Sequence, residues 1–164
     1  MTEFTIPAVV PADPDANITD LLVERVKETP NRALFAVPDG SGWRDITAAQ
    51  FHEQVIALAK GLVAAGIEPG DKVGFIARTT YDWTLVDFAL LFAGAVMVPI
   101  YETSSSSQIA WNLADSGAVA CIVESEDHAA RLEEVRGDLP LIRSVWALHT
   151  GDLDRMVSEG TGVE

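Results

Sequence analysis

Two stretches decide the fold of this 164-residue chain: GDKVGFIA at residues 70–77 and LFAGAVMVPI at residues 91–100. In the first, residues 72–77 are mostly apolar and follow the turn residues Pro69 and Gly70, which predicts a strand. The second joins the end of an apolar helix to a strand that is apolar throughout, as parallel strands buried on both faces are. Between them, residues 81–93 are apolar on nearly every face of a helix, which indicates a helix covered on several sides. Strand, crossover helix and strand together predict a parallel α/β unit.

The same alternation continues after residue 100. Ser105 and Gln108 have the spacing of a capping box, in which each side chain binds a main-chain N–H of the first turn. The serine run at 104–107 therefore begins a helix, which ends at Gly117. The remaining expected elements are a strand at 119–123, a helix at about 126–136, a strand at about 142–148 and a helix that opens at 151–154, for which residues 158–164 offer little to pack on.

The first third of the sequence predicts a leader, a helix and a hairpin. Residues 1–16 contain three prolines without an apolar period, so we expect an extended leader outside the core. A helix is expected over 18–28, because its apolar residues follow helical spacing between a capping Asn17 and Pro30. The other expected elements are strands at 33–37 and 43–46 joined as a hairpin, and a helix that begins at Thr47 and ends at Gly66.

These elements predict an α/β fold. We expect a mainly parallel sheet with right-handed crossovers and helices on both faces, preceded by a short antiparallel hairpin. The length and the 48% hydrophobic content suit one core. The predicted division of the chain is an extended leader at 1–16, an α/β subdomain at 17–150 and a tail at 151–164.

The charge of the chain disfavours two classes of partner. Lys and Arg number 11 against 25 Asp and Glu, a formal net charge of -14. Such a charge repels phosphate backbones and anionic lipid headgroups, so neither nucleic acid nor a membrane surface is an expected partner. No apolar run reaches the ~18 residues of a membrane span, and the amino terminus lacks the basic-then-apolar order of a secretory signal. We therefore expect a cytoplasmic protein without a membrane span.

Residue types that often carry chemistry have plainer interpretations here. Cys121 lies in an apolar strand, where it is expected to be a small buried hydrophobe rather than a nucleophile. His52, His128 and His149 are too scattered for a local metal site, and we interpret them as surface or core residues. The glycines before Lys72 lack the spacing and order of a phosphate loop, and the Gly-Ser-Gly run of the hairpin loop lacks the third glycine and the following helix of a dinucleotide-binding fingerprint.

Ligands of open parallel sheets bind beyond the carboxyl ends of the strands. In this sequence those ends are the segments 78–80, 101–104 and 124–125. Glu124, Glu126 and Asp127 could hold a cation there, although favouring the positive amino end of the next helix is their plainer role.

Three aromatic residues of the apolar helix at 81–93 leave a choice open. Trp83, Phe88 and Phe92 either line an acyl tunnel or, as aromatic residues of such helices usually do, belong to the core. We assign no catalytic, cofactor-binding or metal-binding residue from the sequence.

The order of several stretches resembles the early core of the adenylate-forming (AMP-binding) superfamily. WRDITAAQF at 43–51 resembles the first core motif of that family, in which a strand ends in a threonine that starts a helix. The stretch at 91–100 resembles the second, and residues 70–73 and Trp83 fit between them. PIYET at 99–103, followed by serines and Gln108, is most similar to the long-chain fatty-acid–CoA ligases. Medium-chain ligases and adenylation domains for other carboxylic acids remain open.

This resemblance implies an enzymatic parent. The intact parent would use ATP, Mg²⁺ and CoA, convert a fatty acid to an acyl-adenylate, and transfer it to CoA. The family uses a Ser/Thr/Gly-rich phosphate loop with its lysine, a Thr-Glu motif, a ribose-binding aspartate and a carboxyl-terminal lysine, and none has a counterpart here. The serines at 104–107 lie too early in the chain. We therefore expect an inactive amino-terminal fragment that binds none of these cofactors, with 151–164 leading into a missing remainder.

The expected partners follow from this interpretation. They are the remainder of the parent enzyme and, in the parent, fatty acid and CoA. Apolar surface left bare by a missing subdomain would exceed the few hundred Å² typical of monomers, so we also expect self-association or strand exchange. A second interpretation is a stand-alone binding or assembly module with the same fold.

Overall fold

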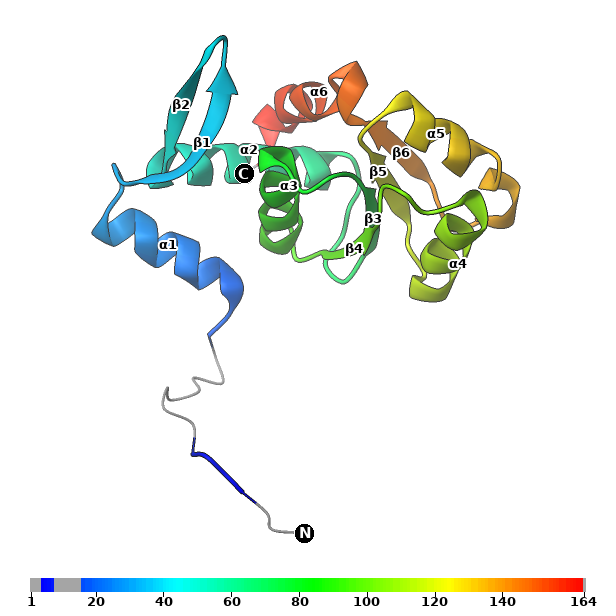
Figure 1. Cartoon of the computed structure of the whole chain (residues 1–164), viewed down its shortest axis with the longest axis horizontal. Helices are drawn as coiled ribbons and strands as arrows, with labels where there is room; N and C mark the ends of the chain where they lie inside the picture. Colours follow the sequence, from blue (N-terminus) through cyan, green and yellow to red (C-terminus); the bar gives the residue numbers. More distant parts are fainter. Residues whose placement is uncertain (1–3, 8–15, 164) are drawn as a thin grey trace.

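The computed structural model describes residues 4–7 and 16–163, and Figure 1 shows their arrangement. The helices are α1 (Ile18–Glu28), α2 (Ala48–Ala64), α3 (Tyr81–Phe92), α4 (Ser106–Ser116), α5 (Glu126–Glu133) and α6 (Asp152–Glu159). The strands are β1 (Ala33–Asp39), β2 (Gly42–Thr47), β3 (Lys72–Ile76), β4 (Val96–Ile100), β5 (Ala120–Val123) and β6 (Ser144–Ala147). Short 3₁₀ turns follow as η1 (Arg136–Asp138), η2 (Leu148–Thr150) and η3 (Gly160–Gly162).

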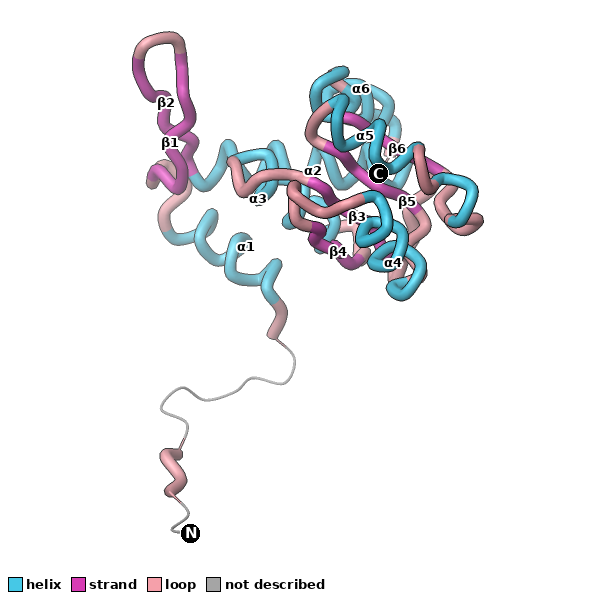
Figure 2. Tube along the Cα trace, turned by 45° about the vertical axis from the view of Figure 1, so that its right-hand side comes forward, coloured by secondary structure: helices cyan, strands magenta, loops and turns pink. Residues whose placement is uncertain are grey.

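The predicted α/β class and the order of its elements are confirmed. β3 to β6 form a parallel sheet in the order β4-β3-β5-β6, and β1 and β2 form a separate antiparallel hairpin. Figure 2 shows the hairpin projecting from the body while the sheet lies among the helices. Two expected elements are shorter than predicted, because α5 ends at Glu133 before the separate turn η1, and β6 spans only 144–147.

Local side-chain chemistry explains where several helices begin. Asn17, Thr47 and Ser105 each form a capping box with the residue three positions later, as predicted for Thr47 and Ser105. These bonds satisfy main-chain N–H groups that have no partner within the helix. The starts of these three helices are therefore specified by residues close in sequence.

The sheet has a hydrophobic cluster on each face. Val73, Phe75 and Trp146 pack with α2, α3 and α6 on one face. Ile76 and Cys121 pack with α4 and α5 on the other. The two-sided cover explains why these strands are apolar throughout. A third cluster joins α1, the hairpin, α2 and α3, with Phe35 and Phe51 in aromatic contact at 4.8 Å between ring centroids.

The expectation that residues 158–164 find little to pack on is wrong. α6 and η3 pack on α2, where Met156 is buried and Gly160 lies against Gly61. The Lys60 ammonium on α2 also donates to the carbonyl of Val163 at 2.7 Å. Two glycines on facing elements permit this close approach, a tertiary effect that sequence periodicity does not reveal.

The expected leader falls mostly outside the described residues, because 1–3 and 8–15 are not among them. Residues 4–7 have no regular secondary structure and are exposed. The division of the chain at 16 and 150 stays a prediction. Within 4–7 and 16–163, no helix combines the length and apolar character needed to cross a bilayer.

Candidate functional site

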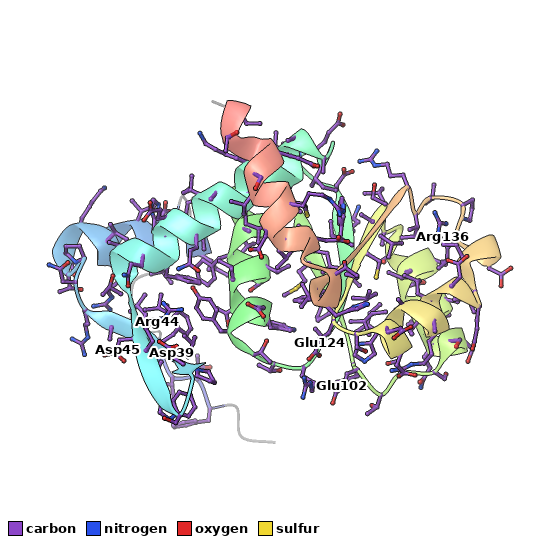
Figure 3. The ribbon with its side chains drawn as sticks, turned by 90° about the horizontal axis from the view of Figure 1, so that it is seen from above. Asp39, Arg44, Asp45, Glu102, Glu124 and Arg136 are labelled. Carbon is purple, nitrogen blue, oxygen red and sulfur yellow. The ribbon has the colours of Figure 1, made fainter. Side chains whose placement is uncertain are left out.

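The carboxyl ends of β3, β4 and β5 meet at one edge of the sheet. Ile76 at the end of β3 is in register with Ile100 on one side and with Val123 on the other. The segments that follow these three residues therefore lie together, as the sequence predicts. Figure 3 shows two of their side chains, Glu102 and Glu124, close to each other. We call the surface formed by 78–80, 101–104 and 124–125 the carboxyl edge.

An ion pair joins the ends of β3 and β5. The main-chain N–H of Arg78 donates to Glu124 Oε2 at 2.8 Å, and its guanidinium Nε donates to Oε1 at 2.8 Å. The side-chain hydrogen bond from Arg78 lowers the pKa of the Glu124 carboxyl, although burial acts in the opposite direction. The same bond raises the pKa of Arg78. The pair fixes the two strand ends to each other and neutralises the charge of both side chains.

Helix α5 fixes the segment that follows β4. The guanidinium of Arg131 donates to the carbonyl of Ser104 at 2.6 Å and to that of Glu102 at 2.9 Å. It also donates to the Asp127 carboxylate at 2.7 Å. His128 is buried, and its Nε2 lies 3.2 Å from the same Glu102 carbonyl. The main chain of residues 102–104 is therefore held in place by hydrogen bonds from the charged side chain of Arg131.

The acidic cluster divides between two roles. Glu126 and Asp127 lie in the first turn of α5, which their plainer interpretation predicts, and Ser125 caps that helix by accepting a hydrogen bond from the main chain of His128 at 3.3 Å. The Glu124 carboxylate instead accepts a hydrogen bond from the Arg78 guanidinium. In the described part of the chain, no three His, Cys, Asp or Glu side chains are grouped so that they could hold a metal ion.

A cavity of about 230 Å³ opens between the ends of β3 and β4. Its lining residues are mostly apolar or aromatic: Ala77, Thr79, Trp83, Pro99, Ile100, Tyr101 and Glu102. The polar groups of its side chains are the hydroxyls of Thr79 and Tyr101, the indole N–H of Trp83 and the carboxylate of Glu102. Such a lining suits an apolar or aromatic group of a ligand better than a phosphate, because the Arg78 guanidinium beside it is already paired.

The three aromatic residues of α3 all pack against the hydrophobic clusters, but their other surroundings differ. Trp83 lines the cavity at the carboxyl edge. Phe88 packs on Phe51 with ring centroids 5.5 Å apart, and Phe92 lies 5.7 Å from the ring of His52. Phe88 and Phe92 therefore belong to the core, and Trp83 is the aromatic residue of this helix that reaches the candidate site.

Cys121 is buried as expected. Burial raises the pKa of its thiol to about 12, so the thiol is uncharged and unreactive at neutral pH. The histidines lie on separate elements, with His52 on α2, His128 on α5 and His149 in η2.

Sequence reasoning missed the Arg78–Glu124 pair and the contacts of Arg131. The signal for the pair is present, because residues of opposite charge follow two apolar strands at nearly the same position. Using that signal requires knowing that β5 lies next to β3 in the sheet, although β4 is the next strand in the sequence. Only the order of the strands in the sheet supplies this.

Comparison with known proteins gives a consistent result at the sequence level. Residues 22–162 match the family described as AMP-binding enzyme. The chain is 35% identical to the long-chain-fatty-acid–CoA ligase FadD15 of Mycobacterium bovis over all of its own length and 28% of that protein. It is 29% identical to the long-chain-fatty-acid–CoA ligase heimdall of Drosophila melanogaster, over 74% of this chain and 18% of that protein.

Solved structures share the fold. A long-chain-fatty-acid-CoA ligase, FadD1 from Archaeoglobus fulgidus, superposes with a TM-score of 0.81 at 17% identity, over 97% of this chain and 33% of that one. The N-terminal domain of FACL13 from Mycobacterium tuberculosis gives 0.75 at 22% identity, over 87% and 36%. The chain spans about 28% of the length of the FadD15 proteins that it matches.

Proposed function

Because this chain belongs to the AMP-binding enzyme family, we propose that it is the amino-terminal part of a cytoplasmic fatty-acid–CoA ligase. The observation that carries the proposal is the 35% identity, over the whole chain, to a long-chain-fatty-acid–CoA ligase of which it covers 28%. In the proposed parent, ATP and a fatty acid give an acyl-adenylate, and CoA then takes the acyl group. The 164-residue chain alone is proposed to be an inactive scaffold.

We propose that the triphosphate of ATP and the magnesium ion are bound outside this chain. Phosphates are bound by unpaired cations and by main-chain N–H groups of glycine-rich loops. At the carboxyl edge, however, Arg78 is paired with Glu124, and Arg131 is occupied by Asp127 and two carbonyls. The proposal therefore assigns the nucleotide, Mg²⁺ and CoA sites to the remainder of the ligase.

The contribution that we assign to this chain is one wall of the substrate cavity. Trp83 and Pro99 present apolar surface that excludes water from whatever lies against them. The bonds from Arg78 and Arg131 hold the surrounding segments in place. A rigid wall of this kind orients an apolar acyl group without taking part in bond making.

The inactivity proposal is tested with the chain itself. Incubated with ATP, Mg²⁺, CoA and palmitate, the 164-residue chain should release no AMP above the rate without enzyme. AMP release that requires all three substrates would refute the inactive-scaffold proposal.

The cavity assignment needs a longer polypeptide that includes this chain. There, Trp83→Ala should raise KM for the fatty acid by about tenfold or more while Trp83→Phe largely restores it, because a lost hydrophobic wall weakens binding. The core variant Phe88→Leu is the control and should leave that KM unchanged. Equal effects of the alanine and phenylalanine variants would contradict the role assigned to Trp83.

A further inference from the structure

The hydrophobic cluster that joins α1, the hairpin, α2 and α3 is open on one side. α1 and the hairpin lie at one end of the molecule, away from the sheet of β3 to β6 (Figure 1). Phe51 is 1% exposed in this cluster, but Leu34, Phe35 and Phe88 pack against it while only partly buried. These four residues line a groove of about 260 Å³. The groove therefore offers apolar and aromatic surface to a ligand.

One charged side chain lies at this groove. Arg25 of α1 lines it and is exposed, whereas every other lining residue is apolar. In the described part of the chain, no carboxylate lies within ion-pair distance of Arg25, although five other arginines are paired. A guanidinium without a partner can donate two parallel hydrogen bonds to a carboxylate. An apolar groove with one such cation has the chemistry of a site for an amphiphilic anion.

We propose that this groove binds a long-chain carboxylate, with its hydrocarbon chain against Phe35 and Phe88 and its carboxylate on Arg25. Leu21 lies four residues before Arg25, on the same side of α1, and lines the groove while 66% exposed. The groove shares no lining residue with the cavity at the carboxyl edge. It is therefore a second site, and it does not depend on the proposed ligase activity.

A carboxylate is the headgroup that the charges at the groove favour. One guanidinium balances the single charge of a carboxylate, whereas a phosphate monoester carries about -1.5 to -2 charges at neutral pH. No second cation lines the groove, and the chain already has a net charge of -14, which repels any excess negative charge. A long-chain alcohol would leave Arg25 without a partner, and an alkylammonium would be repelled by it.

The test is isothermal titration calorimetry of dodecanoate, kept below its micelle concentration, into the 164-residue chain without ATP or CoA. We expect saturable binding of one dodecanoate per chain. Each methylene that the groove buries should tighten binding about fourfold, so octanoate should bind at least tenfold more weakly. Dodecan-1-ol should also bind at least tenfold more weakly, because it lacks the charge that Arg25 recognises. Dodecyl phosphate should not bind more tightly than dodecanoate.

Variants of Arg25 test the role of its charge. Arg25→Gln should raise the Kd for dodecanoate about tenfold or more, and Arg25→Lys should raise it less, because lysine keeps the charge without the planar fork. Arg32→Gln is the matched control. It makes the same change at an exposed arginine that does not line the groove, and it should leave the Kd unchanged.

A pair of variants at Leu21 tests the position of the carboxylate. Leu21→Asp places a carboxylate four residues before Arg25, where the two side chains pair, and should abolish binding by competing with the ligand. Leu21→Asn has nearly the same size without the charge and should weaken binding less. Leu21 is exposed, so both variants should fold, which circular dichroism checks.

A longer polypeptide that includes this chain separates this site from the proposed ligase site. There, Arg25→Gln should remove one equivalent of bound dodecanoate without changing the rate of acyl-CoA formation. A longer polypeptide that forms no acyl-CoA but still loses one equivalent would contradict the proposed function and support this site.

Four results would overturn the proposal. One is the absence of saturable dodecanoate binding to the 164-residue chain, and another is an equal effect of Arg25→Gln and Arg32→Gln. A third is tighter binding of dodecyl phosphate, which would assign the groove to a lipid phosphate. The last is a longer polypeptide in which Arg25→Gln removes no bound dodecanoate, which would mean that the remainder of the enzyme covers the groove.

Discussion

Glu124 accepts hydrogen bonds from both the main chain and the guanidinium of Arg78, and so joins two strands whose residues are far apart in the sequence. Its carboxylate is mostly shielded, at 16% exposure, whereas the Arg78 side chain is 70% exposed. The shielded partner is the one whose loss leaves main-chain and side-chain donors unsatisfied. Glu124 is therefore the residue to change.

Replacing this carboxylate should make the thermal midpoint less dependent on pH. Glu124→Gln is expected to lower the thermal midpoint near pH 7. Because Arg78 lowers the folded-state pKa of Glu124, its stabilising effect is present above the ordinary value of 4.5 and is lost as pH falls through the lower folded value. The difference between wild type and variant should therefore shrink as the pH falls below 4.5.

Thermal melts followed by circular dichroism between pH 3 and pH 7 check this expectation. Glu126→Gln, an exposed neighbour in the first turn of α5, is the matched control and should have a smaller effect. A wild-type-to-variant difference that stays constant across this range would show that Glu124 acts through shape rather than charge.

The thiol of Cys121 should be protected by the fold. At pH 8 a pKa of about 12 in place of 9.0 reduces the thiolate fraction by three decades, ~1000-fold. Iodoacetamide should thus label the native chain at least that much more slowly than the chain in urea, as followed by mass spectrometry. Rapid labelling under native conditions would mean that β5 opens often.

Contact between α2 and α6 depends on two glycines. A Cβ built on Gly61 would lie 2.5 Å from the main-chain oxygen of Met156, which cannot swing away. Gly61→Ala should destabilise the chain by about 1–3 kcal/mol, as overpacking does. Gly137→Ala meets nothing within 4 Å and should change stability by less than ~0.5 kcal/mol. Urea denaturation measures both, and equal effects would contradict the packing argument.

At the level of elements, the sequence predicts what local chemistry decides. The capping boxes at Thr47 and Ser105 and the apolar strands near Val73 place helices and strands within a few residues of where they lie. Strand direction also predicts that a site would form at the carboxyl edge.

What the sequence does not predict depends on distant residues meeting. The packing of Gly61 on Gly160 joins elements about a hundred positions apart, and neither glycine is distinguished by local pattern. The reach of Arg131 to the segment after β4 likewise requires α5 to lie beneath that segment. Such contacts depend on the order of the strands in the sheet. The periodicity of apolar residues in the sequence does not determine that order.

The whole molecule carries a large excess of negative charge, 25 acidic against 11 basic residues. Mutual repulsion disfavours the compact state and is screened by salt. Raising NaCl from ~0.02 M to ~0.3 M should therefore raise the melting temperature by a few degrees. KCl should have the same effect, because the origin is screening. A midpoint that falls with salt would mean that ion pairs such as Arg143–Asp71 dominate instead.

The bond from Lys60 to Val163 joins residues separated by 103 positions. A ribosome adding ~5–20 residues per second needs about 5–20 s to make the intervening chain. Throughout that interval the nascent α2 has its side toward α6 uncovered, although its own residues are already complete. The speed of translation over this stretch thus sets how long the uncovered apolar surface of the nascent chain is accessible to chaperones in the cell.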